Sequence, residues 1–125
     1  MLFADAAGGR PQFGDGIHNL VKELYPQASL QKIPLTDPLI TGHFGGGISI
    51  ASVHYRKFTL QEYGVKNVPQ LLGVKQNHRW VIVFSPWDVT SGLLGTNTWG
   101  IAGYAPQSAQ AIARNVMLYA LAHKP

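Results

Sequence analysis

The first 33 residues alternate a short apolar run, an amphipathic run and a second short run. Residues 2–5 read Leu-Phe-Ala-Asp and predict a strand that ends in a carboxylate. Positions 17, 20, 21 and 24 are apolar, which is the spacing of a helix that Asp15 can cap and that Pro26 ends. Residues 30–33 predict another strand. A strand, a helix and a strand within about 30 residues predict a βαβ unit with parallel strands and a right-handed crossover.

The rest of the chain predicts a hairpin and a long final helix. Residues 71–75 and 79–84 flank Gln-Asn-His, a turn in which Asn tolerates left-handed backbone geometry. Residues 79–84 are almost wholly apolar, so we expect a central strand covered on both faces. Residues 53–58 predict a further strand. Pro106 suits the first turn of a helix that runs to about His123. Together these elements predict one layered α/β domain over residues 1–125.

Composition limits the class of protein. A chain of 125 residues with 46% hydrophobic and 13% charged residues is the size of one globular domain and excludes disorder. The absence of Cys excludes a disulfide scaffold, a four-cysteine zinc site and a thiol nucleophile. Composition does not distinguish the cytosol from the periplasm.

The charge and hydropathy patterns exclude two kinds of partner. Ten basic residues against six acidic ones give a net charge of +4, but the basic residues are scattered and form no stripe of the kind that binds nucleic acid. The run of residues 80–84 is far shorter than the roughly 20 apolar residues of a membrane-spanning helix. Residues 1–4 do not form a signal peptide. We therefore expect neither a nucleic-acid partner nor a membrane span.

Polar residues follow the predicted strands, where α/β sheets bind their ligands. Asp5 ends the first strand, and Ser85 and Asp88 follow the central one across a Pro-Trp pair. His43 precedes Phe and three glycines, which let a backbone approach a ligand. Each candidate has a structural alternative: Asp5 can close an Asx turn, and Ser85 or Asp88 can cap a helix.

Trp87 completes the set of ligand-binding candidates. Its ring, like that of Trp99, lies in a predicted loop and can stack on a sugar or base, although packing the loops is the default use. The five His have no metal-binding spacing, so we expect no metal site. There is no Gly-x-Ser-x-Gly elbow, and Pro86 removes the amide that an oxyanion hole after Ser85 would use. No catalytic residue is assigned and no cofactor is expected.

Several segments together resemble a bacterial family, the domain of unknown function numbered four-one-five-nine. This family is similar in fold to class I glutamine amidotransferases and to trehalose-utilisation-type proteins. The resemblance implies a three-layer, flavodoxin-like and glutamine amidotransferase-like α/β sandwich with a mostly parallel sheet and one β-hairpin. It implies no established reaction. The segments that carry it are residues 2–5, 33–39, 69–74, 81–88, 103–104 and 114–121.

The chain departs from the family pattern in three ways. Members often carry an acidic residue, His and Pro where this chain has Thr36, Asp37 and Pro38. Amidotransferases use a Cys nucleophile, which this chain lacks. Members also have strand–helix units ahead of the segment that matches residues 2–5, so the chain resembles the carboxyl-terminal part of the family domain. We therefore expect the strand at residues 2–5 to be an exposed edge that promotes a homo-oligomer.

Three functions are compatible with these residues. The favoured one is a non-catalytic binding or interaction module for a small polar ligand, with a carbohydrate as one class. The alternative is a hydrolase or isomerase in which Asp5 and Asp88 act as acid and base and His43 assists, which requires both carboxylates to reach one substrate. The third is a structural partner domain of a larger cell-envelope system.

Overall fold

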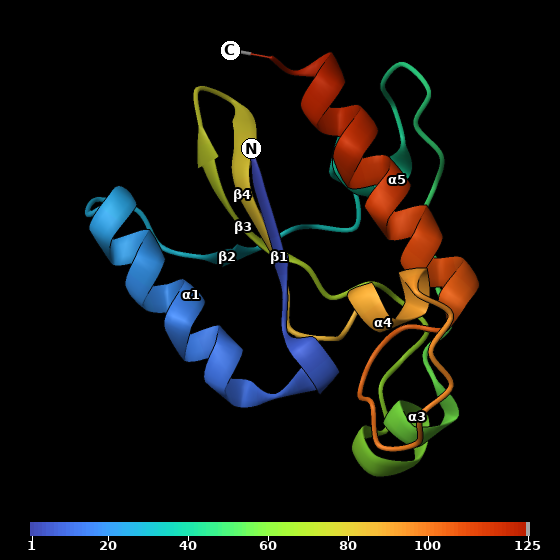
Figure 1. Ribbon diagram of the computed structural model, residues 1–125. Helices are drawn as coiled ribbons and strands as arrows, with labels where there is room; N and C mark the ends of the chain where they lie inside the picture. The colour runs from blue at the N-terminus through green and yellow to red at the C-terminus, as the bar shows by residue number, and fades with distance from the viewer. Residues whose placement is uncertain (125) are drawn as a thin grey trace.

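Four strands form one mixed sheet in the order β1-β4-β3-β2. The computed structural model describes residues 1–124 (Figure 1). The strands are β1 (Leu2–Asp5), β2 (Gln31–Lys32), β3 (Leu72–Gln76) and β4 (Arg79–Ser85). The pair β1–β4 is parallel, whereas β4–β3 and β3–β2 are antiparallel.

The predicted mostly parallel, flavodoxin-like and amidotransferase-like sheet is therefore wrong. The helix between β1 and β2 does carry the chain across the sheet, and the two strands run in the same direction. However, β4 and β3 lie between them, so β1 and β2 do not pair. The hairpin β3–β4 fills the centre of the sheet and reverses the chain there. Among residues 1–124, the only two strands that pair in parallel are then β1 and β4.

The predicted hairpin is confirmed. Its turn consists of Asn77 and His78, whose φ angles of 51° and 63° are both positive, as a tight two-residue hairpin turn requires. Gly73 on β3 lies beneath the ring of Trp80. A Cβ atom on Gly73 would lie 2.7 Å from that ring, so the absence of a side chain lets the indole pack across the strand.

One face of the sheet is covered by α1 (Pro11–Leu24), as Figure 1 shows. Val21 of α1 packs with Val74 and Ile82 of the hairpin. The helix begins with Pro11 in its first turn, where a missing N–H costs nothing. The prediction that Asp15 caps this helix is wrong, because Asp15 lies inside the helix, where it is exposed.

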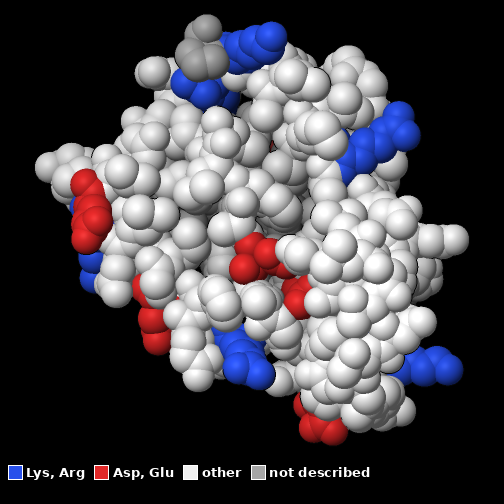
Figure 2. Space-filling view, viewed as in Figure 1, with Lys and Arg blue, Asp and Glu red and all other residues white. Residues whose placement is uncertain are grey.

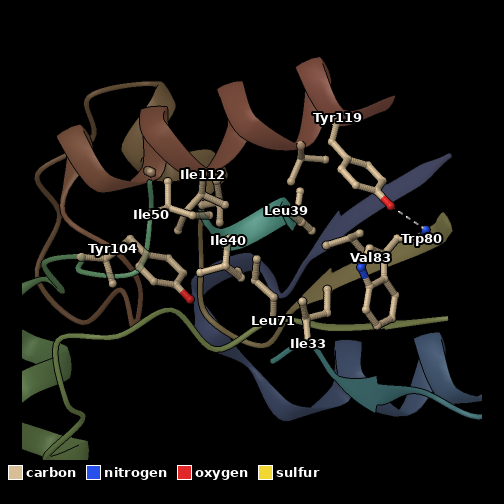
Figure 3. Close-up of a cluster of buried hydrophobic side chains, with 14 of the residues drawn as sticks. Ile33, Leu39, Ile40, Ile50, Leu71, Trp80, Val83, Tyr104, Ile112 and Tyr119 are labelled. Atoms are coloured by element: carbon tan, nitrogen blue, oxygen red, sulfur yellow. Dashed lines mark hydrogen bonds between the residues drawn. The ribbon is translucent and has the colours of Figure 1, made fainter. Parts of the chain in front are cut away.

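The opposite face is covered by α5 (Pro106–Ala122) and the short α2 (Pro38–Thr41). The predicted start and end of α5 are confirmed. Figure 3 shows its apolar side chains meeting those of the sheet and of residues 33–50 in one cluster. The backbone N–H of Trp80 donates a hydrogen bond of 3.2 Å to the hydroxyl of Tyr119, which ties the start of β4 to the last turns of α5. The chain thus has helices on both faces of a mixed sheet.

Asp37 holds the start of α2. Its Oδ1 atom accepts hydrogen bonds from the backbone N–H of Leu39 and from Nε1 of Trp80, each 3.0 Å long. Its Oδ2 atom lies 3.5 Å from Nζ of Lys75. Asp37 is therefore a buried helix cap in this chain.

Three short helices lie near the carboxyl ends of β1 and β4 or beyond them. They are η1 (Ala7–Gly9), α3 (Lys57–Tyr63) and α4 (Thr90–Leu93). The strand predicted over residues 53–58 is wrong. Val53 and Tyr55 are buried in alternation, as in a strand, but Tyr55 forms only an isolated bridge with Tyr104, and the chain turns into α3 at Lys57. Alternating burial without a neighbouring strand does not make a sheet.

On the face that Figure 2 shows, Lys and Arg side chains lie at several separate positions. Over residues 1–124, no helix has the length and apolar character to cross a membrane. The outer side of β1 is an edge of the sheet. Self-association through this edge stays a prediction.

Replacing Asn115 with Ala should lower the free energy of unfolding by about 2–3 kcal/mol, because buried backbone polar groups would lose their hydrogen-bond partner. Asn115 is fully buried on α5 and bonds Ile48 N, Ile48 O and Leu39 O at 3.0, 2.6 and 2.9 Å. Urea unfolding measures the change. Met117, 61% exposed on the same helix, supplies the control M117A, expected within about 0.5 kcal/mol of the unaltered chain. Equal effects of the two substitutions would contradict this account.

Candidate functional site

Asp5, Ser85 and Asp88 lie at one end of the sheet, as their positions after the predicted strands indicated. Asp5 is opposite Ser85 in the parallel pair β1–β4, and Asp88 follows three residues later. The structure therefore brings these three candidates together. What each side chain can do depends on its hydrogen-bond partners.

The carboxylate of Asp5 holds the start of α4. Its Oδ2 atom accepts from the backbone N–H groups of Val89 (2.7 Å) and Thr90 (2.8 Å), and its Oδ1 atom accepts from the hydroxyl of Thr90 (3.0 Å). A carboxylate at these otherwise unpaired N–H groups satisfies them and complements the helix dipole. Asp5 thus acts as a helix cap supplied from a different strand.

Asp88 is almost wholly buried, at 2% exposure, and joins η1 to α4. Its Oδ2 atom accepts from the N–H of Gly8 (2.6 Å) and the hydroxyl of Ser91 (2.9 Å), and its Oδ1 atom accepts from the N–H of Ser91 (2.7 Å). The backbone of Asp88 also forms a parallel bridge with Gly103, where a side chain would collide with it. The carboxylate is therefore committed to three protein donors.

Ser85 is buried, and its side chain bonds to the backbone of Trp87 across Pro86. Its hydroxyl donates to the carbonyl oxygen of Trp87 at 2.6 Å and accepts from the Trp87 N–H at 3.3 Å. Its exposed fraction is zero, so the hydroxyl does not face a cleft.

His43 lies apart from these residues. It is exposed in the loop after α2, and the next residue, Phe44, packs against Tyr119 and His123 at the end of α5. In contrast, α4 contacts α5 near Pro106 and Ala109 at its beginning. About ten helical residues, roughly 15 Å of helix, separate these two places. The structure does not bring His43 to Asp5 and Asp88.

Trp87 borders an open cleft of about 730 Å³, which we call the Trp87 cleft. Its polar lining consists of Lys32, Tyr63, Lys66 and Gln70, and the remaining lining is glycine, proline, valine and leucine. Nε1 of Trp87 donates to Oε1 of Gln70 at 3.0 Å, which fixes the indole at the rim. The ring of Tyr63 meets that of Trp87 edge-on, with centroids 5.1 Å apart.

Sequence reasoning found Trp87 but missed its neighbours in the cleft. Tyr63 and Lys66 come from the end of α3 and the loop after it, beyond the strand that the sequence predicted over residues 53–58. The sequence did contain one signal for the end of this helix, Gly64. In the structure, Gly64 follows Tyr63 and adopts the left-handed conformation that commonly ends helices.

Two stacked tyrosines lie behind the cleft. The rings of Tyr55 and Tyr104 have centroids 4.6 Å apart, and both residues are buried. The hydroxyl of Tyr55 donates to the carbonyl of Val68 at 2.7 Å, and the N–H of Gln70 donates to the hydroxyl of Tyr104 at 3.0 Å. Burial raises the pKa of both phenols, and the neighbouring Tyr104 adds to the effect on Tyr55. The neutral pair anchors the loop that carries Gln70.

Within residues 1–124, no three His, Asp or Glu side chains are grouped so that they could hold a metal ion.

The family described as Domain of unknown function (DUF4159) matches residues 1–121. The chain belongs to this family. A search of curated proteins and a search of solved structures found no match. Membership in this family assigns no reaction to the chain.

The Asp88→Ala substitution, which removes the carboxylate, should lower the free energy of unfolding by about 2–3 kcal/mol, because buried N–H groups lose a charged acceptor. Asp88→Asn keeps one acceptor oxygen and should lose less. Asp15→Ala is the matched control, since Asp15 is exposed on α1, and should change stability by about 0.5 kcal/mol or less. Urea unfolding of the three variants measures these effects. A D88A variant as stable as D15A would show that Asp88 is not a structural tie.

Alkaline pH should unfold the protein through its buried tyrosines. Burial raises the pKa values of Tyr55, Tyr104 and Tyr119, so the folded chain retains protons that the unfolded chain releases above about pH 10. Their contribution to stability is complete below that pH and falls as pH rises further. Phenolate absorbance from these residues should appear together with the loss of circular dichroism. The Tyr55→Phe substitution should reduce the amplitude of that absorbance change. Phenolate formation in a chain that is still folded would contradict the prediction.

Proposed function

We propose that the protein is a non-catalytic module that binds a small carbohydrate in the Trp87 cleft. The observation that carries the proposal is the pairing of two aromatic rings with lysine and amide donors around one cleft. Its volume of about 730 Å³ falls in the range of roughly 300–1,000 Å³ typical of small-molecule sites.

The rings supply the apolar part of recognition. Trp87 is half-buried and fixed through Gln70, whereas Tyr63 is 56% exposed and presents its ring at the same rim. A sugar ring has apolar C–H faces and a polar edge of hydroxyl groups. A rigid aromatic surface beside polar donors matches both features, because aromatic side chains offer a large apolar face.

The polar lining selects for oxygen acceptors. The ammonium groups of Lys32 and Lys66 can each donate three hydrogen bonds, and Gln70, whose Oε1 is engaged by Trp87, offers its NH2 group. None of the described residues that line the cleft is Asp or Glu. An acidic sugar, such as a uronate or a sugar phosphate, therefore fits better than a neutral one.

Acid–base catalysis by Asp5 and Asp88 lacks comparable support. Neither carboxylate lines the Trp87 cleft, and each accepts three hydrogen bonds from protein groups. A general acid or base must reach the proton it transfers. The hydrolase or isomerase alternative stays a prediction without an observation that favours it.

Titration with glucose, glucuronate and glucose 6-phosphate, followed by NMR, tests the proposal. We expect shifts at Trp87 Nε1 and Tyr63, with tighter binding of the two acidic sugars. Tyr63→Ala should weaken all binding about 3- to 10-fold, the effect of losing one aromatic contact. Lys66→Gln should weaken binding of the acidic sugars only.

The control is Lys22→Gln, an exposed lysine on α1 outside the cleft, which should bind as the unaltered chain does. Absence of saturable binding for all three sugars, or equal affinities of the Y63A and K22Q variants, would overturn the proposal.

A further inference from the structure

A second cleft, of about 480 Å³, lies between the start of α3 and the loop of residues 97–101. We call it the Arg56 cleft. Arg56, Lys57 and Phe58 form one wall, and Asn97, Thr98 and Trp99 form the other. It shares no lining residue with the Trp87 cleft, to which only the far end of α3 contributes.

Two nitrogen atoms of the Arg56 guanidinium group have no hydrogen-bond partner among residues 1–124. Both atoms, Nε and Nη2, are buried. The backbone N–H of Arg56 donates to the carbonyl of Gly103 at 2.9 Å, so the base of the side chain is fixed. A guanidinium is always charged and carries five N–H donors, and burying its donors unpaired is unfavourable. An acceptor from outside the chain that reached these donors would remove that cost.

The charge around Arg56 specifies an anion. Lys57 adds an exposed second cation, and the described lining residues include no Asp or Glu. The one ion pair found among residues 1–124 joins Lys75 and Asp37, which do not line this cleft. The planar fork of a guanidinium matches the oxygens of a carboxylate or a phosphate, which it binds through two parallel hydrogen bonds.

The aromatic wall specifies what the anion is attached to. Trp99 is 64% exposed, although its ring meets that of Phe58 edge-on with centroids 5.4 Å apart. An indole that is fixed on one side and open on the other offers a face for a flat apolar group. Asn97 and Thr98 add polar groups beside it.

We propose that the Arg56 cleft is a second binding site, which takes a small organic anion whose carboxylate or phosphate pairs with Arg56 and whose flat apolar part covers Trp99. The site is independent of the carbohydrate proposal, because it rests on different residues and a different chemical group. Carboxylates and phosphate monoesters share the required chemistry.

NMR titration with benzoate and with phenyl phosphate tests the site, and benzyl alcohol serves as the uncharged analogue. We expect saturable shifts of the Arg56 Nε–H and Trp99 Nε1–H signals with an anion and at least tenfold weaker binding of benzyl alcohol. Arg56→Gln should weaken anion binding at least tenfold, Arg56→Lys should weaken it less, and Trp99→Ala should weaken benzoate and benzyl alcohol alike. A response to only one of the two anions supports the site and identifies the group it prefers.

Two controls separate binding from folding. Arg79→Gln changes an arginine outside the cleft and should bind as the unaltered chain does, and Lys66→Gln should retain benzoate binding even if it affects sugars. Because Arg56 has unpaired buried donors, Arg56→Gln should leave the urea midpoint unchanged or raise it. No Arg56 shift with either anion, equal affinities of the R56Q and R79Q variants, or a markedly lower urea midpoint for R56Q would each overturn the proposal.

Discussion

Burial of β4 on both faces is the constraint on which the other elements depend. Residues 80–85 of this strand are all buried. Val83 faces the cluster under α5, and Ile82 and Phe84 belong to the clusters under α1. A strand without a solvent face requires a helix layer on each side and a paired strand at each edge. The chain meets these requirements with β1 on one edge and the hairpin partner β3 on the other.

The parts of the fold that could be predicted are those that local sequence specifies. Residues 79–84 are apolar enough to indicate a central strand, Asn77 suits the hairpin turn, and Pro106 indicates where α5 begins. Strand order is different, because it depends on contacts between segments far apart in the chain. Residues 31–32 show that β2 exists but not that it pairs with β3. The alternation of Val53 and Tyr55 describes an extended segment but cannot show that no strand lies beside it.

The candidate site was predicted in the same partial way. Strand ends placed Asp5, Ser85 and Asp88 together, yet the sequence could not show which groups their oxygen atoms would meet. In the structure, the carboxylates of Asp5 and Asp88 accept hydrogen bonds from backbone N–H groups of η1 and at the start of α4. The two clefts instead lie beside α3, which has Arg56 at its cap and ends with Tyr63. A continuous series of edge-on and stacked rings runs past this helix, through Trp99, Phe58, Tyr63, Trp87, Tyr55 and Tyr104.

The internal use of three aspartates also shapes the field outside the molecule. Asp37 and Asp88 are buried and Asp5 is half-buried, so only Asp15, Glu23 and Glu62 stand exposed among six acidic residues. All ten Lys and Arg residues are at least partly exposed, although two nitrogen atoms of Arg56 are buried. Carboxylates engaged by N–H dipoles project less negative potential into solvent than free ones do. Approaching anions therefore meet a more basic surface than a net charge of +4 suggests, which speeds their encounter at low ionic strength and fades as salt screens it.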